Sequence, residues 1–267
     1  MKLIHLAVFF IAFGTSSCTW GVPNNQKKSI AKDTLSYSYK KLKQRAPDCG
    51  NKPDSTCTLI NLRYPVFSGQ KTLNDTVISR LTSTFKIDEK TDYTLAGLAK
   101  HFIDFYQKDK LSGNATEMAY DLDIDASVVR QDSSITTLRL KGYTYLGGAH
   151  GGSSVTFINW NTKTAGKITL DDILLPGYQE KLRLSAEKIF RADEKLSDTA
   201  SLADGYFFKD NKFALNDNYL ITPLGIRFLY NEYEIKPYAA GTTDLFIPYA
   251  QIKLLLRPHT VVSQYIK

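Results

Sequence analysis

Residues 225–249, GIRFLYNEYEIKPYAAGTTDLFIPY, predict a strand, an excursion from the sheet and a second strand. Apolar side chains alternate along 226–230, which indicates a strand with one buried face. Pro237 lacks a backbone donor and Gly241 permits a turn, so the chain between the strands should leave the sheet. Apolar residues resume at 245–247. We therefore expect two strands joined by a rigid aromatic segment at the centre of the fold.

The same segment gathers residues that are suited to ligand binding. Tyr230, Tyr233 and Tyr238 surround Pro237, and a rigid proline lowers the entropy that such rings lose on binding. Exposed tyrosines suit sugar rings and protein partners alike. Glu234 stands among apolar neighbours. It could act as a general acid, although we favour a carboxylate that holds the segment to neighbouring amides.

A second candidate is His150, which lies in the sequence GGAHGG at 147–152. Four glycines permit sharp turns and can present one imidazole at a loop tip. The segment lacks the lysine and the strand-to-helix setting of a phosphate-binding loop. Two interpretations stay open: a wide hairpin turn whose histidine bonds the backbone, and a histidine that meets a ligand or substrate.

These motifs resemble the C-terminal domain of the RsiV-type envelope proteins: YNEYEIKPYAAG at 230–241, IPYAQIKLLL at 247–256 and the upstream GGAHGG. The resemblance covers residues 136–267, and a similarity to the usual N-terminal companion domain covers 35–125. The C-terminal domain, of unknown function, occurs alone, in anti-sigma-factor ectodomains and beside peptidoglycan deacetylase domains. The resemblance implies an envelope protein, and it implies lysozyme binding as in some relatives. The deacetylases have a separate catalytic domain, and we expect none in this sequence.

The first residues predict export and anchoring. Residues 1–17 resemble a cleaved signal peptide, because their apolar run is too short to span a bilayer. The sequence TSSC, which ends at Cys18, resembles a lipobox, although Thr15 stands where leucine is usual. We expect acylation of Cys18 and a polar tether over 18–33. By analogy with lipoprotein sorting, Thr19 favours an outer-membrane anchor that faces the periplasm.

The cysteine count and the net charge narrow the class of protein further. With Cys18 acylated, Cys49 and Cys57 remain as an even pair in an exported chain, which predicts a structural disulfide. A zinc site would need a second pair of ligands. The formal net charge of +7 is scattered along the chain, so we expect no nucleic-acid partner.

Periodicity elsewhere predicts an α+β fold of antiparallel sheets with packed helices, in two small intertwined units at 34–130 and 131–267. The expected strands are 59–65, 118–128, 135–146 and 155–160, with shorter ones within 207–222; the expected helices are 71–86, from 91 or 92 to 106, 178–196 and 247–256. Asp92 is the expected cap of the second helix, and His101 beside its inner face is expected to be structural.

Three aspartates on the expected strand at 118–128 raise the question of a metal. Asp121, Asp123 and Asp125 alternate with apolar residues, and the segment lacks the glycine and glutamate of a calcium loop. They should line a solvated face of the strand. We expect no metal and no other cofactor.

Two functions stay open. The first is a non-enzymatic envelope lipoprotein that binds a lysozyme-like protein or a cell-wall glycan through His150, Tyr230, Tyr233, Glu234 and Tyr238. The second is a peptidoglycan hydrolase or deacetylase-like enzyme that uses His150 and Glu234, which requires both side chains to converge in one cleft. No G-x-S-x-G or H-E-x-x-H motif accompanies them.

Overall fold

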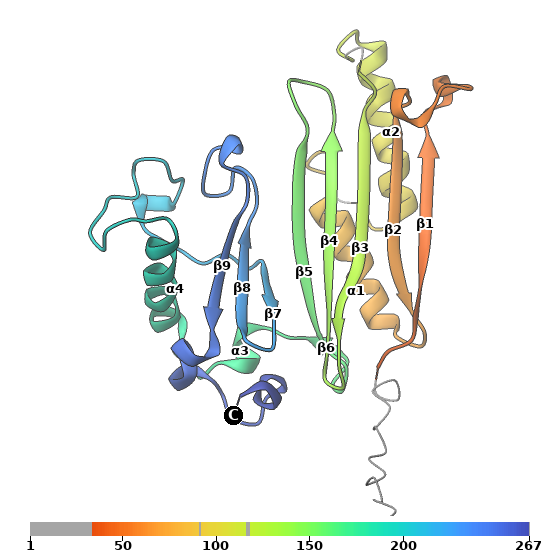
Figure 1. Ribbon diagram of the computed structural model, residues 1–267. Coiled ribbons are helices and arrows are strands. Elements are labelled where there is room, and N and C mark those ends of the chain that lie inside the picture. Colours follow the sequence, from red (N-terminus) through yellow and green to blue (C-terminus); the bar gives the residue numbers. More distant parts are fainter. Residues whose placement is uncertain (1–33, 91, 116–117, 267) are drawn as a thin grey trace, which may run out of the picture.

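The computed structural model describes residues 34–90, 92–115 and 118–266, which form two α+β units side by side (Figure 1). The expected signal peptide at 1–17 and the tether at 18–33, with Cys18, lie outside these residues. In the part of the chain that is described, no helix has the length and apolar character needed to cross a bilayer.

A six-stranded sheet with the order β1-β2-β3-β4-β5-β6 forms the first unit. Its strands are Tyr37–Arg45 (β1), Leu59–Phe67 (β2), Asp121–Gln131 (β3), Ile135–Tyr145 (β4), Gly152–Asn161 (β5) and Gly166–Lys167 (β6). Neighbouring strands are antiparallel except β2 and β3. That pair is parallel because the chain between the two strands returns through helices α1 (Lys71–Thr84) and α2 (Leu95–Leu111).

Both helices cover one face of this sheet and build the first hydrophobic core with it (Figure 1). Leu73, Val77 and Leu81 of α1 are fully buried at the predicted four-residue spacing. Helix α2 begins later than predicted: Thr94 caps it by accepting a hydrogen bond from the Gly97 backbone at 2.9 Å. The predicted cap, Asp92, instead bonds His101, as described below.

Strand β1 was not expected from the sequence, and β2 continues past the proline that was expected to end it. The sequence of β1, YSYKKLKQR, has a single aliphatic residue, Leu42, and its lysines suit an edge strand that must discourage further pairing. Pro65 lies opposite Tyr39 of β1. Strand β3 pairs with β2 only as far as Arg63. Because no strand of the described chain pairs with Pro65 on the β3 side, its lack of a backbone N–H removes no hydrogen bond there.

The second unit is a three-stranded antiparallel sheet with the order β7-β8-β9, packed against helices. Its elements are α3 (Leu170–Ile173), α4 (Gln179–Asp193), β7 (Tyr219–Ile221), β8 (Gly225–Tyr230) and β9 (Thr243–Pro248). Short 3₁₀ helices lie at Pro47–Cys49, Asp54–Thr56, Lys209–Asn211, Tyr238–Ala240, Tyr249–Leu255 and Val261–Tyr265. The two predicted strands around the excursion are therefore confirmed, and the helix expected at 247–256 is a 3₁₀ helix.

The second core explains why the segment at 207–222 forms only one short strand, β7. Phe208 and Phe213 pack on Phe190 of α4, with ring centroids 5.6 and 5.1 Å away. Between them, Asp210 and Asn211 have positive φ angles of 53° and 55°. Because the chain turns there to bury both rings, it cannot stay extended.

The two units meet along strand β5. The expected boundary at 130/131 falls near the turn between β3 and β4, and these strands pair in the first sheet. Asn159 of β5 reaches β7: its amide donates to the Tyr219 carbonyl at 2.8 Å and accepts from the Ile221 backbone at 2.9 Å. Side-chain amides therefore join the two sheets where backbone pairing stops.

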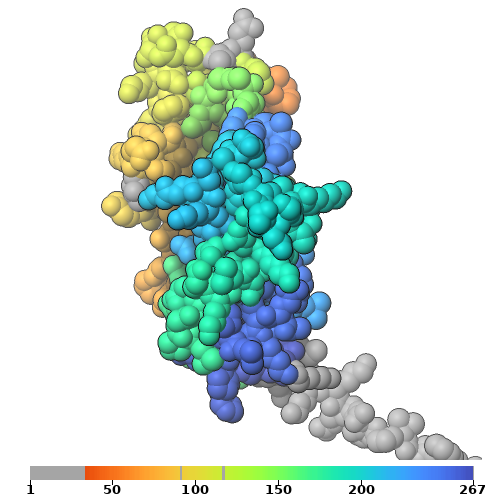
Figure 2. All heavy atoms as spheres, turned by 90° about the vertical axis from the view of Figure 1, so that its left-hand side faces the viewer, coloured from red at the N-terminus to blue at the C-terminus, as the bar shows by residue number. Residues whose placement is uncertain are grey.

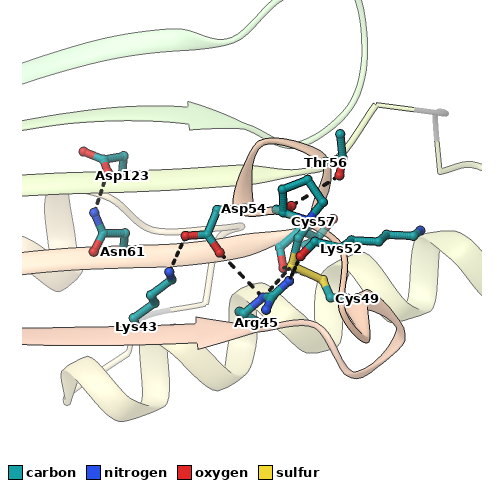
Figure 3. A network of polar contacts seen from close by, with 11 residues as sticks. Lys43, Arg45, Cys49, Lys52, Asp54, Thr56, Cys57, Asn61 and Asp123 are labelled. Carbon is teal, nitrogen blue, oxygen red and sulfur yellow. Dashed lines mark hydrogen bonds and ion pairs between the residues drawn. A yellow bond between two sulfur atoms is a disulfide. The ribbon is translucent and has the colours of Figure 1, made fainter.

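The predicted disulfide between Cys49 and Cys57 is present, with a Cα–Cα distance of 5.3 Å. It closes the loop between β1 and β2, and both cysteines are buried in the first core. The Arg45 guanidinium lies over this loop and donates to Cys57 Sγ at 3.2 Å (Figure 3).

Candidate functional site

The excursion after β8 is held against the free edge of β5. Strand β6 pairs only with the end of β5, at Trp160 and Asn161. On this side, earlier backbone groups of β5 have no strand partner among the described residues. Asn231 Oδ1 accepts from the Val155 backbone at 2.8 Å, and Asn231 Nδ2 donates to the Val155 carbonyl at 3.1 Å. Glu232 accepts from the Ser153 backbone at 3.1 Å. The Asn-Glu dipeptide thus satisfies strand-edge groups that would otherwise need water.

Glu234 closes the turn of the excursion. Its carboxylate accepts from the Asn231 backbone at 2.8 Å and from the Asn216 amide at 2.6 Å. The side chain holds the segment to neighbouring amides, as the sequence interpretation favoured, but Glu234 is exposed rather than buried. The reason is that Ile235, the next residue, turns into the core in its place.

The excursion presents two tyrosines to the histidine of the hairpin between β4 and β5. The rings of His150 and Tyr238 stack with centroids 4.2 Å apart. Tyr233 lies 5.4 Å from Tyr238 and 6.1 Å from His150, and its ring is within 17° of parallel to the imidazole. We call these three residues the aromatic platform. Figure 2 shows the two segments that carry it, one green and one blue, near the upper end of the molecule.

Hydrogen bonds determine which nitrogen of His150 carries the proton. Nδ1 lies 2.8 Å from the Gly151 carbonyl, which can only accept, so Nδ1 is the donor. Nε2 lies 3.2 Å from the Tyr233 hydroxyl and accepts from it. Because this bond joins the rims of two nearly parallel rings, His150 and Tyr233 extend each other as one flat surface. Both are exposed, whereas Tyr238 is partly covered.

Local backbone conformations hold both halves of the platform. Tyr233 has a φ of 64°, a left-handed conformation that is uncommon for a bulky residue and is kept only where its surroundings require it. At the hairpin, a Cβ on Gly147 would lie 2.6 Å from the Tyr120 hydroxyl, and one on Gly151 would lie 2.3 Å from the Tyr143 hydroxyl. These two glycines therefore let the loop pack directly on tyrosines of the sheet.

The open face of the sheet next to the hairpin is hollowed by a pocket of about 450 Å³. Tyr143, whose hydroxyl meets Gly151, is part of its wall, so the pocket reaches the base of the platform hairpin. Asp121 also lines the pocket, and desolvation together with the nearby charge of Asp123 raises the pKa of its carboxyl. The pocket thus offers hydroxyl and carboxylate groups beside an aromatic surface.

Polar contacts stiffen the other wall of this pocket (Figure 3). Lys43 of β1 bonds Asp54 of the disulfide loop, and Arg45 lies 3.7 Å from the same carboxylate. Asn61 of β2 donates to Asp123 of β3 at 2.8 Å. Cross-strand partners therefore occupy part of the aspartate row: Asp123 has Asn61, and Asp125 has Arg63 at 2.8 Å.

The structure brings together only some of the predicted site residues. His150, Tyr233 and Tyr238 meet in the platform, with Glu234 at the turn behind them. Tyr230 does not join them: it is 1% exposed and its hydroxyl donates to the Ala214 carbonyl at 2.8 Å. Expecting it to bind ligand was wrong, because the alternation that buries Ile226 and Phe228 buries Tyr230 as well.

The structure also assigns His101 and shows what the sequence interpretation missed. His101 bonds Asp92 at 3.0 Å and Asp88 at 3.2 Å, which is the structural role expected of it. Asn231 and Glu232, which dock the excursion on β5, were not recognised. Two polar residues directly after an aromatic strand were the available signal, but the sequence does not show which strand edge they face.

Two family descriptions match the chain, one over each unit. Residues 51–153 match the family described as deacetylase PdaC, and residues 171–250 match the protein family of unknown function DUF3298. His150 falls in the first match, and Tyr233 and Tyr238 fall in the second. The platform is thus assembled from both matched segments. No curated protein sequence matches the chain.

Solved structures with the same fold come from two bacteria. A DUF3298 family protein from Pseudomonas aeruginosa PAO1 has a TM-score of 0.67 at 23% sequence identity, over 84% of this chain and 95% of that chain. A member of the DUF3298 family from Bacteroides fragilis NCTC 9343 has a TM-score of 0.67 at 25% identity, over 87% of this chain and 97% of that chain. These similarities confirm the α+β fold, whereas the RsiV-type resemblance stays a prediction.

Proposed function

We propose that this chain is a non-enzymatic cell-envelope protein, anchored through an acylated Cys18, that binds a cell-wall glycan on the aromatic platform. The observation that carries the proposal is the hydrogen-bonded pair of His150 and Tyr233 rings, which lie nearly parallel, are exposed, and are backed by Tyr238. Rings with an apolar face and a polar rim suit a sugar, whose ring is apolar on its face and polar at its edge.

The neighbouring pocket supports a glycan over a purely apolar ligand. Its volume of about 450 Å³ is within the range of small-molecule sites. Asp121 and Tyr143 in its wall can bond the hydroxyl and amide groups of a sugar that extends from the platform. The ligand would then stack on rings at one end and form hydrogen bonds at the other.

The hydrogen bonds of His150 and Glu234 support binding over catalysis. Both ring nitrogens of His150 have partners, Gly151 and Tyr233. The Glu234 carboxylate bonds Asn231 and Asn216, and within the described residues it forms no hydrogen bond or ion pair with the imidazole. An acid–base pair would need both groups within reach of one substrate atom.

Envelope placement is supported by the predicted signal peptide and lipobox and by the RsiV-type resemblance. The described part of the chain agrees with export in one respect, the disulfide between Cys49 and Cys57. Disulfides persist in oxidising compartments.

Sedimentation with purified, insoluble peptidoglycan tests the proposal. Tyr233→Ala should weaken binding about tenfold, equivalent to about 1.4 kcal/mol, because it removes half of the flat surface and the partner of His150 Nε2. Tyr93→Ala is the matched control, since Tyr93 is 85% exposed and lies in the segment between α1 and α2. Binding that is the same in both variants, or no binding by the native chain, would refute the glycan proposal.

The same preparation tests the alternatives. Release of modified muropeptides that disappears in His150→Ala or Glu234→Ala would establish the enzymatic alternative. Binding to lysozyme without binding to peptidoglycan would make a protein the ligand instead of a glycan.

A further inference from the structure

A second concave surface lies at the end of the molecule opposite the platform. A cleft of about 670 Å³ separates the turn at 161–166 from the C-terminal segment at 257–264. Figure 2 shows the last described residues, in deep blue, at this lower end. The cleft takes no part in the platform or its pocket, so the proposed function does not use it.

Positive charge dominates the cleft. Lys163, Lys167 and Arg257 line it and are exposed, and in the described part of the chain none of them has a carboxylate partner. Among the described residues that line the cleft, one has a carboxylate, Asp172. It is occupied in capping α3, because it accepts from the Thr169 backbone at 2.7 Å and from the Thr169 hydroxyl at 2.8 Å. Three cations therefore face solvent around a hollow with little opposing charge.

The backbone that carries these cations is fixed. The turn before β6 is tied to the β3–β4 turn, because the Thr162 backbone donates to the Ser134 carbonyl at 3.0 Å. Lys167 pairs with Trp160 in the sheet. The Arg257 backbone donates to the Ile173 carbonyl at 2.9 Å. The spacing of the cations is thus a property of the fold rather than of a loose loop.

Two leucines protrude near the C-terminal segment that carries Arg257. Leu224 is 74% exposed and Leu254 is 90% exposed. Leu224 accepts from the Tyr249 backbone at the start of the 3₁₀ helix Tyr249–Leu255, and Leu254 lies near the end of that helix, three residues before Arg257. Large apolar side chains next to unpaired cations are typical of surfaces that enter the membrane interface.

The start of β1 lies at the same end of the molecule as the basic cleft. Leu35, two residues before β1, accepts from the Gln131 side chain at the end of β3 at 2.9 Å. Arg130 stacks over the ring of Tyr265 at 4.6 Å, so the start of β1 and the C-terminal segment share one end (Figure 1). An anchor at Cys18 would bring this end to the membrane.

We infer that this basic end docks on the surface of a membrane that contains anionic phospholipids, with the phosphates at Lys163, Lys167 and Arg257 and the two leucines inserted beside them. The orientation rests on the anchored Cys18 of the proposed function. The leucines favour a lipid surface over a soluble phosphate, which would leave them in water. Docking in this way would direct the aromatic platform away from the membrane, toward the cell wall.

Vesicle sedimentation tests this inference without the lipid anchor. The chain from residue 19 onward contains both cores and should bind vesicles of phosphatidylglycerol and phosphatidylcholine, and not vesicles of phosphatidylcholine alone. Changing Lys163, Lys167 and Arg257 together to Gln should weaken binding about 100-fold, at about fivefold for each cation. In the matched control, Lys181, Lys188 and Lys209 are changed together to Gln. This variant loses the same amount of charge at other places on the surface, and its binding to vesicles should be weakened far less.

A second pair of variants separates a lipid surface from a phosphate site. Leu224→Ser with Leu254→Ser should also weaken vesicle binding, whereas Leu111→Ser with Leu184→Ser, two leucines that are exposed elsewhere, should not. Inorganic phosphate that displaces the chain completely, with no effect of the leucine change, would overturn the membrane inference in favour of a soluble anion. Absence of vesicle binding would also overturn it. Peptidoglycan sedimentation would be unaffected in either case, so the two proposals fail separately.

Discussion

Two asparagines bond the same residue of β5 and should differ in their effect on stability. Asn231 provides the acceptor for the Val155 backbone N–H and one donor to its carbonyl. Asn218 provides a second donor to that carbonyl at 2.8 Å and a bond to the Leu229 carbonyl at 3.1 Å. The Leu229 carbonyl also accepts from Asn216 at 2.7 Å. Asn231→Ala thus leaves an unpaired N–H, whereas Asn218→Ala leaves each carbonyl with a donor.

The expected magnitudes follow from this difference. A buried donor without a partner costs about 1–3 kcal/mol, and partial exposure at the edge of β5 favours the middle of that range, about 2 kcal/mol for Asn231→Ala. Asn218→Ala should cost about 0.5–1 kcal/mol, since no group is orphaned. In the double variant the Val155 carbonyl loses both donors, so the loss should exceed the sum of the single losses by about 1 kcal/mol.

Urea and thermal unfolding of the three variants measure these differences. For a protein of this size Asn231→Ala should lower Tm by about 4–8 °C. It should also weaken peptidoglycan binding, because Asn231 positions the excursion that carries Tyr233 and Tyr238. An Asn218→Ala variant that is as destabilised as Asn231→Ala, or a strictly additive double variant, would refute the assignment of Asn231 as the essential partner of the β5 edge.

Three further predictions concern other parts of the chain. Replacing Cys49 and Cys57 by Ser should lower the free energy of unfolding by about 2 kcal/mol for so short a loop, and thiol labelling of the unfolded, unreduced native chain should find neither cysteine free. Asp132 is desolvated, but hydrogen bonds from the Tyr265 hydroxyl and from two backbone groups outweigh this and lower its pKa. Its contribution to stability should therefore be full above the unfolded value of about pH 4 and lost as pH falls through the lower folded value, so that Asp132→Asn destabilises at neutral pH and not in strong acid; an equal loss at every pH would contradict this. Cys18→Ala should move the protein from the membrane to the soluble fraction, and unchanged fractionation would exclude the lipid anchor.

The spacing of apolar residues was sufficient to predict an element where that element's own sequence shows the period of its buried face. The alternation at 226–230 and the resumption at 245–247 predicted β8 and β9, and the four-residue spacing at 71–86 predicted α1, because burial of one face imposes a period on a strand or a helix. The disulfide could be predicted for a similar reason, since Cys49 and Cys57 lie close together in the sequence. Strand β1 escaped prediction because an edge strand with a single aliphatic residue, Leu42, has no such period.

The sequence alone therefore determined most of the elements, though not β1, together with the fold class and the residues that the excursion and the GGAHGG loop could offer. The tertiary structure decided which of them meet. His150 and Tyr233 are 83 positions apart and touch only because β5 has a free edge that Asn231 and Glu232 occupy. Tyr230, only three residues before Tyr233, is excluded from the contact, because it belongs to β8 and is buried on the same face of that strand as Ile226 and Phe228. The spacing of apolar residues along the chain indicates the period of each helix or strand. Which segment covers a strand edge depends instead on how the two cores pack, and it is determined only when they assemble.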